Sequence, residues 1–187
     1  MPYVLTRGEA ESQLDVIRGR ANQLLAGLDP IQFNWQPDRG RRWSIGQCLE
    51  HLSRTTMTYG ESIDAAIAAA PPAGEQSSAV PGLLGRWMIW TMEPPALLRL
   101  PTRAALQPHS GLDPDDVRRR FSDSLRYAAE VAARALQIDA SRTKFANPFL
   151  NGMRAFDVAT GVLVMLAHNR RHLAQAEKVR QHRDFPR

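Results

Sequence analysis

Cysteine is nearly absent from this sequence: the 187 residues include a single one, Cys48. One thiol cannot form a disulfide within the chain, and it cannot build a zinc site based on several cysteines. The scarcity of cysteine suits a reducing compartment, and we expect a cytoplasmic protein.

Long apolar runs are also missing. No uninterrupted apolar stretch approaches the roughly 20 residues that a membrane span requires. The N-terminal sequence "MPYVLTRGEAESQ" lacks the apolar core of a signal peptide. An apolar content of 43% and a charged content of 23% are typical of a globular protein. We expect no membrane association and one domain over residues 1–187.

Acidic residues are outnumbered, 19 against 24 Lys and Arg, which gives a net charge of +5. Much of the excess lies in "DRGRR" (38–42), "RRR" (118–120) and "RR" (170–171). Charges spread over helix surfaces in this way usually face solvent, so we do not expect nucleic-acid binding.

Alternating strand patterns and internal repeats are not apparent, whereas helical periodicity is strong. It predicts long helices over about 7–28, 44–70, 113–136 and 153–181. Ser44 and Gln47 form a capping box at the start of the second helix. Asp113 and Pro114 suit the start of the third helix. The first half of the fourth helix is apolar nearly all round, as a central helix would be.

Residues 71–112 form a long connection rich in Pro, Gly and Ser. Within it, the segment 83–92 predicts a short helix that buries Trp87 and Trp90. We expect this connection to cover one end of the bundle. The predicted fold is all-α, a mostly up-and-down four-helix bundle with a long elaborated crossover between helices two and three.

Three histidines are predicted to point into the bundle. His168 and His172 lie one turn apart on the apolar side of the fourth helix, and His51 shares a side of the second helix with Cys48. If the two helices pack with matching levels, the three imidazoles converge. The spacing alone leaves two interpretations open, a metal site or hydrogen-bonded core histidines.

The other polar residues near these histidines are expected to lie elsewhere. Glu50 and Arg54 should face away from His51. His109 and His182 are expected in a loop and in the tail.

The stretch "FNWQPDRGRRWSIGQCLEHLSRT" (33–55), followed later by "LAHNRRHLAQAEKVR" (166–180), resembles the DinB-like (DinB/YfiT) superfamily. The shared pattern is a Trp-Ser helix start, Leu-x-His-Leu on the second helix and H-x-x-x-H on the fourth. The resemblance implies a four-helix bundle with a divalent metal ion held by His51, His168 and His172. It also implies a homodimer. Residues 71–112 match nothing in the pattern.

Three imidazoles leave a coordination position open, which is the catalytic arrangement for zinc. Imidazole ligands do not choose between Zn, Ni and Fe. By resemblance, the expected activity is a low-molecular-weight-thiol-dependent S-transferase acting on a small-molecule substrate. The alternatives are a metal-dependent hydrolase and a non-catalytic metal- or ligand-binding stress protein. The sequence offers no evident general base, and this favours the thiol reaction.

A few further residues are candidates for the pocket around the histidines. Thr55, Tyr59 and Met165 could line it. Arg41 and Arg42, just before the second helix, could attract an acidic thiol.

Overall fold

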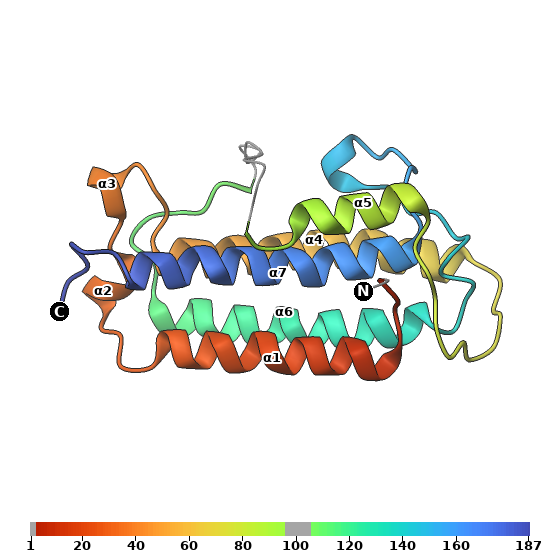
Figure 1. Cartoon of the computed structure of the whole chain (residues 1–187), viewed down its shortest axis with the longest axis horizontal. Coiled ribbons are helices and arrows are strands. Elements are labelled where there is room, and N and C mark those ends of the chain that lie inside the picture. Colours follow the sequence, from red (N-terminus) through yellow and green to blue (C-terminus); the bar gives the residue numbers. More distant parts are fainter. Residues whose placement is uncertain (1–2, 96–105) are drawn as a thin grey trace.

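The computed structural model describes residues 3–95 and 106–187, and over these ranges the protein is all-α. Isolated β-bridges occur there, but no strand. The elements in chain order are α1 (Arg7–Leu25), α2 (Pro30–Asn34), α3 (Pro37–Gly40), α4 (Ile45–Ala69), α5 (Leu83–Met92), α6 (Pro114–Ala135), the 3₁₀ helix η2 (Pro148–Leu150) and α7 (Val158–Arg180). The predicted all-α bundle is confirmed, with α1, α4, α6 and α7 as its four long helices (Figure 1).

The chain does not alternate in direction at every step of the bundle. The colours of Figure 1 show that α4 and α6 run the same way, whereas α1 and α7 run the opposite way. The long crossover carries the chain back along the bundle between α4 and α6. As a result α4 and α6 are parallel neighbours, and α4 and α7 are antiparallel neighbours.

Each long helix begins at a polar cap that satisfies free backbone N–H groups. At α4, Ser44 Oγ accepts from the Gln47 N–H at 3.1 Å and Gln47 Oε1 accepts from the Ser44 N–H at 3.0 Å. The predicted capping box is therefore confirmed, as is the Asp113 cap of α6. Asp157 caps α7, so this helix begins at Val158 and not near 153 as predicted.

Helix α7 is the centre of the bundle, because it contacts α1, α4, α5 and α6. The apolar run that opens it is buried on all sides as a consequence. Among the helices of residues 3–95 and 106–187, none combines the length and apolar character that crossing a membrane would require.

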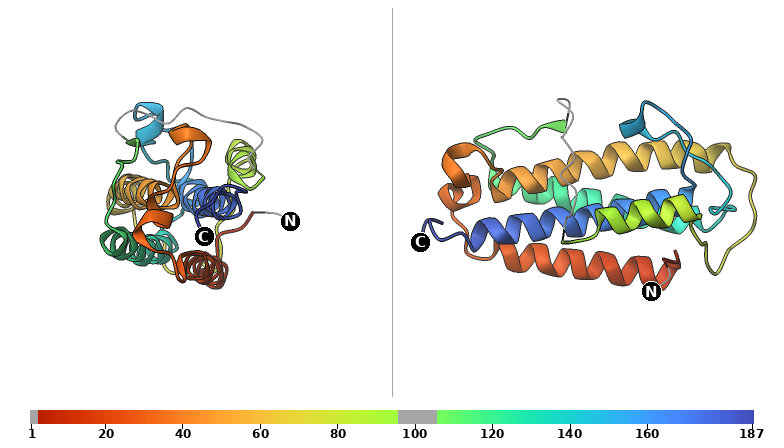
Figure 2. Two further views of the ribbon diagram at one scale, coloured as in Figure 1. Left: turned by 90° about the vertical axis from the view of Figure 1, so that its left-hand side faces the viewer. Right: turned by 45° about the horizontal axis from the view of Figure 1, so that its top comes forward.

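The crossover was expected to cover one end of the bundle, but its helix α5 lies along the side of the bundle. In the part that is described, α5 packs lengthwise against α7 (Figures 1 and 2). It approaches closely through Gly85, where a Cβ atom would lie 2.0 Å from Thr160 Oγ1. Trp87 and Trp90 face outward and are 53% and 55% exposed, so the prediction that they are buried is wrong. Within the segment 71–112, which the family pattern did not match, residues 96–105 lie outside the described residues.

The connection from α1 to α4 contains two short helices, α2 and α3. Phe33 of α2 is fully buried and packs on the first turn of α4 at Gly46. The absence of a side chain at Gly46 lets α2 lie this close to the start of α4.

Replacing Gly46 with alanine is expected to lower the free energy of unfolding by about 1–3 kcal/mol, because the new Cβ would overpack this contact. An ideal Cβ there would lie 2.3 Å from Phe33 Cε1. Gly19→Ala in α1 is the matched control, since its Cβ would meet nothing within 4 Å. The control should gain about 0.5–1 kcal/mol from the better helix former. Urea unfolding measures both changes, and equal stabilities for the two variants would contradict the packing.

Candidate metal centre

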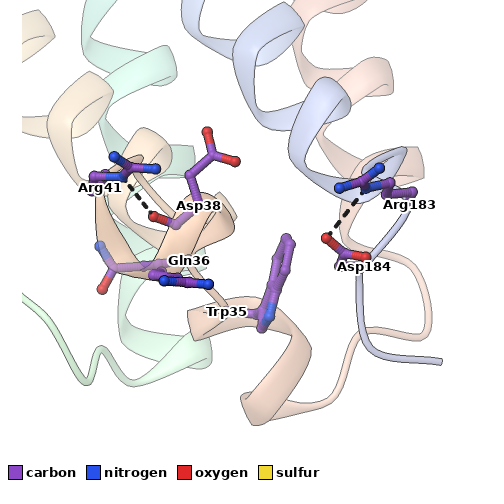
Figure 3. Close-up of a pocket in the computed structure, with 7 residues that line it drawn as sticks. Trp35, Gln36, Asp38, Arg41, Arg183 and Asp184 are labelled. Carbon is purple, nitrogen blue, oxygen red and sulfur yellow. Dashed lines mark hydrogen bonds and ion pairs between the residues drawn. The ribbon is translucent and has the colours of Figure 1, made fainter.

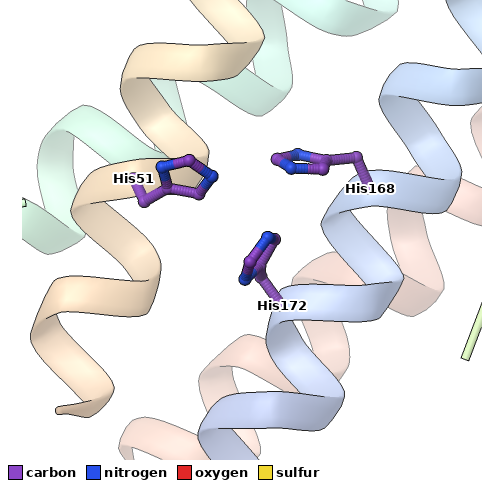
Figure 4. A group of neighbouring side chains, drawn as sticks. All are labelled: His51, His168 and His172. Atoms are coloured by element: carbon purple, nitrogen blue, oxygen red, sulfur yellow. The ribbon is translucent and has the colours of Figure 1, made fainter. Parts of the chain in front are cut away.

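Three histidines from α4 and α7 meet inside the bundle (Figure 4). The ring centroids lie 5.3 Å apart for His51 and His168, 4.7 Å for His51 and His172, and 4.6 Å for His168 and His172. One nitrogen of each ring lies within 4.8 Å of the others. The structure thus brings the three residues together, while their role as metal ligands stays a prediction.

The helix directions explain why the histidines meet. His51 lies about two turns after the Ser44 cap, near the beginning of α4. His168 and His172 lie in the second half of α7. Because the two helices are antiparallel, the beginning of α4 and the later turns of α7 lie at the same level of the bundle. The i, i+4 spacing of His168 and His172 then puts both rings on the side facing α4.

Hydrogen bonds orient two of the rings. His51 Nδ1 lies 3.1 Å from the Leu106 carbonyl oxygen, and His172 Nδ1 lies 3.0 Å from Gln175 Oε1. Both partners are acceptors, so in each neutral ring Nδ1 carries the hydrogen and Nε2 keeps its lone pair. The His168 ring makes no hydrogen bond to any residue in the described ranges. The Nδ1–H donations of His51 and His172 are typical of metal-ligating imidazoles.

The surroundings keep all three rings neutral. Burial is the main cause of the lowered pKa of His51. Burial, followed by the neighbouring His172 and His51 and by Arg171, holds the pKa of His168 well below its usual value. Burial, with His51 and Arg171 adding to it, lowers the pKa of His172 to about 3. A neutral imidazole is the form that binds a metal ion, so no proton has to be removed near neutral pH.

Trp43 forms an aromatic wall beside the cluster. Its ring is stacked on His172 at 5.7 Å and tilted against His51 at 4.9 Å. The His51 side of the cluster is buried, whereas His168 and His172 keep partial exposure. The cluster is therefore walled on one side and reachable from solvent on another. Trp43 belongs to the Trp-Ser motif at the start of α4, but the motif did not predict that its ring would lie beside the histidines.

The donor set fits a divalent metal ion. Within the described part of the chain, the group contains three imidazoles and no cysteine, aspartate or glutamate. Zinc binds imidazole nitrogen at about 2.0–2.1 Å, which places tetrahedral ligands about 3.4 Å apart. One nitrogen of each clustered ring lies within 4.8 Å of the others, so the three donors are already gathered around one point. Three ligands leave a position for water or substrate.

Of the three residues considered for the pocket, two bond elsewhere and the third is buried in the core. The Thr55 hydroxyl donates to the His51 carbonyl oxygen at 2.8 Å, so it contacts the backbone and not the rings. Tyr59 accepts from Asn147 Nδ2 at 3.2 Å, and its ring stacks on Phe149, away from the histidines. Met165 is a buried core residue on α7.

Glu50 differs most from expectation, because its side chain is only 3% exposed and bonds to His109. The prediction that it simply faces away from His51 misses this contact. His109 is a loop residue, as expected, with a side chain that is 73% exposed. His182 lies in the tail beside Trp35, with ring centroids 5.4 Å apart.

A separate pocket of about 660 Å³ lies at the end of the bundle formed by α2, α3 and the tail (Figure 3). Trp35, Asp38, Arg41 and Arg183 are among its lining residues, and none of the three clustered histidines is. Arg41 Nε donates to the Asp38 carbonyl oxygen at 3.1 Å, while Arg42 pairs with the Asp38 carboxylate at 2.6 Å. Of the two arginines considered for substrate attraction, only Arg41 lines this pocket.

The metal-free protein is expected to lose stability as the pH falls below about 6.5. In the unfolded chain the pKa of His172 is near its ordinary value of 6.5, whereas burial lowers its pKa to about 3 in the folded protein. The unfolded state therefore binds more protons between these values. At pH about 5 this costs the folded state about 2 kcal/mol relative to pH about 7. Urea unfolding of the wild type and His172→Asn at both pH values measures it. An equal loss of stability in the two proteins would contradict the attribution of this pH dependence to His172.

Comparison with known families supports the relationship that the motifs suggest. The family model of the DinB superfamily matches residues 13–176, which includes all three clustered histidines. No match to the chain was found among curated proteins or among solved structures.

Proposed function

The chain belongs to the DinB superfamily, and on that premise we propose that His51, His168 and His172 hold a divalent metal ion that serves a low-molecular-weight-thiol-dependent S-transferase. The single observation that carries the proposal is the convergence of three neutral imidazoles with one nitrogen of each within 4.8 Å. Zn, Ni and Fe all suit this ligand set. A bound ion would supply Lewis acidity that lowers the pKa of a coordinated thiol.

The surrounding residues support a thiol reaction more than a hydrolysis. A hydrolase normally needs a carboxylate or similar group that moves protons at the metal. The nearest candidate is Glu50, but it is not part of the cluster, and both of its oxygens bond to His109. In a thiol transfer the proton can leave to solvent, through the partly exposed side of the cluster. Sulfur then bonds to the electrophilic carbon, whose leaving group departs with its electron pair.

Neighbouring groups would help to place the substrates. Trp43 offers an apolar surface beside His51 and His172. Arg171 contributes to the lowered pKa of His168 and His172, so its positive charge is felt at the histidine cluster. A small thiol with an anionic group would be attracted to this combination.

An activity screen tests the proposal. The protein is loaded separately with Zn, Ni and Fe, and incubated with a panel of low-molecular-weight thiols and small electrophiles. Mass spectrometry follows the S-conjugate. We expect an S-conjugate that forms only when both the metal ion and the thiol are present. Hydrolysis of a substrate without thiol would favour the hydrolase alternative. Metal binding with no turnover of any kind would favour the binding-only alternative.

We also propose that the protein is a homodimer that uses the outer face of α5. Leu83, Trp87 and Trp90 recur at helical spacing along this face and are 83%, 53% and 55% exposed. Large aromatic side chains aligned on one exposed face are typical of an interaction surface.

Replacing both Trp87 and Trp90 with lysine is expected to convert a dimer into a monomer, because two charges would have to be buried in the interface. Light scattering coupled to size exclusion should give the wild type about twice the 20.9 kDa mass of one chain. Val16→Lys is the control, since Val16 is an exposed apolar residue on α1. A monomeric wild type, or a double variant that stays dimeric, would contradict the proposal.

A further inference from the structure

A buried carboxylate beside His51 is not used by the proposed reaction. Both oxygens of Glu50 face one residue: Oε2 accepts from the His109 backbone N–H at 2.7 Å, and Oε1 bonds His109 Nδ1 at 2.8 Å. A carboxylate that is only 3% exposed is costly unless it is hydrogen-bonded. The two bonds to His109 therefore account for its burial, and they tie the end of the crossover to α4.

The same short segment contacts the metal centre. The Leu106 carbonyl oxygen lies 3.1 Å from His51 Nδ1, and the Gln107 carbonyl oxygen accepts from Arg54 Nη1 at 3.1 Å. Side chains of Glu50, His51 and Arg54 on α4 thus bind three of the four residues of the segment 106–109. Glu50 provides the strongest of these attachments, because its two hydrogen bonds involve a charged acceptor.

Residue 112 fixes the far side of this segment. The Leu112 N–H donates to Asn34 Oδ1 at 2.8 Å, and Asn34 Nδ2 donates to the Leu112 carbonyl oxygen at 2.9 Å. The end of the crossover is therefore attached to α2 as well as to α4. Of these attachments, Glu50 is the one closest in sequence to the histidine whose orientation depends on the segment.

We propose that Glu50 is a positioning residue of the metal centre. It holds the segment 106–109 against α4, so that the Leu106 carbonyl keeps the hydrogen on His51 Nδ1 and leaves the Nε2 lone pair for the metal ion. The inference rests on the proposed metal binding. Hydrogen-bond partners of a ligating imidazole fix its tautomer and orientation, and losing one typically costs about 10–100-fold in metal affinity.

A positioning role can be separated from a direct effect of the negative charge. Glu50→Gln keeps the shape and both hydrogen bonds, because the amide oxygen can accept from the His109 N–H and the amide nitrogen can donate to a neutral His109 Nδ1. It removes only the charge. Glu50→Ala removes the hydrogen bonds and the charge together. If position matters, the glutamine variant resembles the wild type, whereas an electrostatic role makes both variants equally weak.

The experiment measures the zinc affinity of the full chain by competition with a chromophoric chelator near neutral pH. Glu50→Ala is expected to bind zinc about 10–100-fold more weakly than the wild type, and Glu50→Gln within about threefold of it. Glu61→Ala is the matched control, because it removes an exposed acid from the same helix and should leave the affinity unchanged. Far-UV circular dichroism shows whether each variant is folded.

A second variant keeps the test decisive if Glu50→Ala does not fold. His109→Ala removes a ring that is 73% exposed, together with one of the two hydrogen bonds, and should weaken zinc binding by about tenfold. Wild-type affinity in either alanine variant would overturn the inference, as would equal weakening in Glu50→Gln and Glu50→Ala. A wild-type protein that binds no zinc would instead overturn the proposed function itself, whatever Glu50 does.

Discussion

Replacing His168 with alanine is expected to weaken zinc binding by about 100- to 1000-fold and to leave the helical bundle folded. Structural zinc sites with four ligands bind with about 10–16 kcal/mol, so one ligand contributes on the order of 3–4 kcal/mol. His168 is the best position for this test. Its ring makes no hydrogen bond to any described residue, so its removal breaks no other contact of that kind.

Zinc titration by calorimetry measures this affinity. His182→Ala is the matched control, because it removes a histidine that lies in the tail beside Trp35, outside the cluster. The control should bind zinc as the wild type does. An unchanged affinity in His168→Ala would show that zinc binds elsewhere, and an equal loss in the control would point to non-specific binding.

The rate of thiol conjugation should fall by at least about 1000-fold in His51→Ala and in His172→Ala, if the metal ion activates the thiol. A thousandfold change corresponds to about 4 kcal/mol of barrier, which is within the several kcal/mol that a metal ion contributes to such chemistry. Trp43 contacts both His51 and His172, so each variant keeps one of these two ring contacts.

The assay follows conjugate formation by mass spectrometry at saturating metal, with His182→Ala as the control. Saturating metal separates loss of affinity from loss of chemistry. His51→Ala with full activity would mean that the reaction does not use the cluster. Activity in the wild type after complete removal of metal would contradict metal-assisted chemistry in this protein.

Local signals in the sequence predicted most of the bundle. The capping box at Ser44 and Gln47 and the Asp113 cap are satisfied within one turn of chain, so they can be identified without the tertiary structure. The apolar run of α7 predicted a central helix, and α7 contacts four other helices. The start of this helix was misplaced because the cap is Asp157, which lies inside the stretch predicted to be helical.

The convergence of His51 with His168 and His172 could be anticipated in part. Helical spacing gives the side of each helix on which a histidine lies, and the inward sides were correctly predicted. Whether the levels of α4 and α7 match depends on helix direction and packing, which spacing does not give. The family resemblance supplied the missing information, since its motifs place all three histidines in one site.

The environment created by the crossover could not be predicted. Glu50 was expected to face away from His51, because a helical projection gives only the side of the helix on which a residue lies. It cannot show that the chain returns 59 residues later and places His109 against Glu50. Trp87 and Trp90 were expected to be buried because they are large and apolar. They are exposed because α5 packs inward through its other face, whose buried residues are Gly85, Ile89 and Thr91.

The decisive measurement is the metal content of untagged protein by mass spectrometry, with His51→Ala and His172→Ala beside the wild type. We expect about one divalent metal ion per chain in the wild type and none in either variant. A wild type that contains no metal and takes up none from Zn, Ni, Mn or Fe would contradict this expectation. The three imidazoles would then be core residues that stay neutral because they are buried.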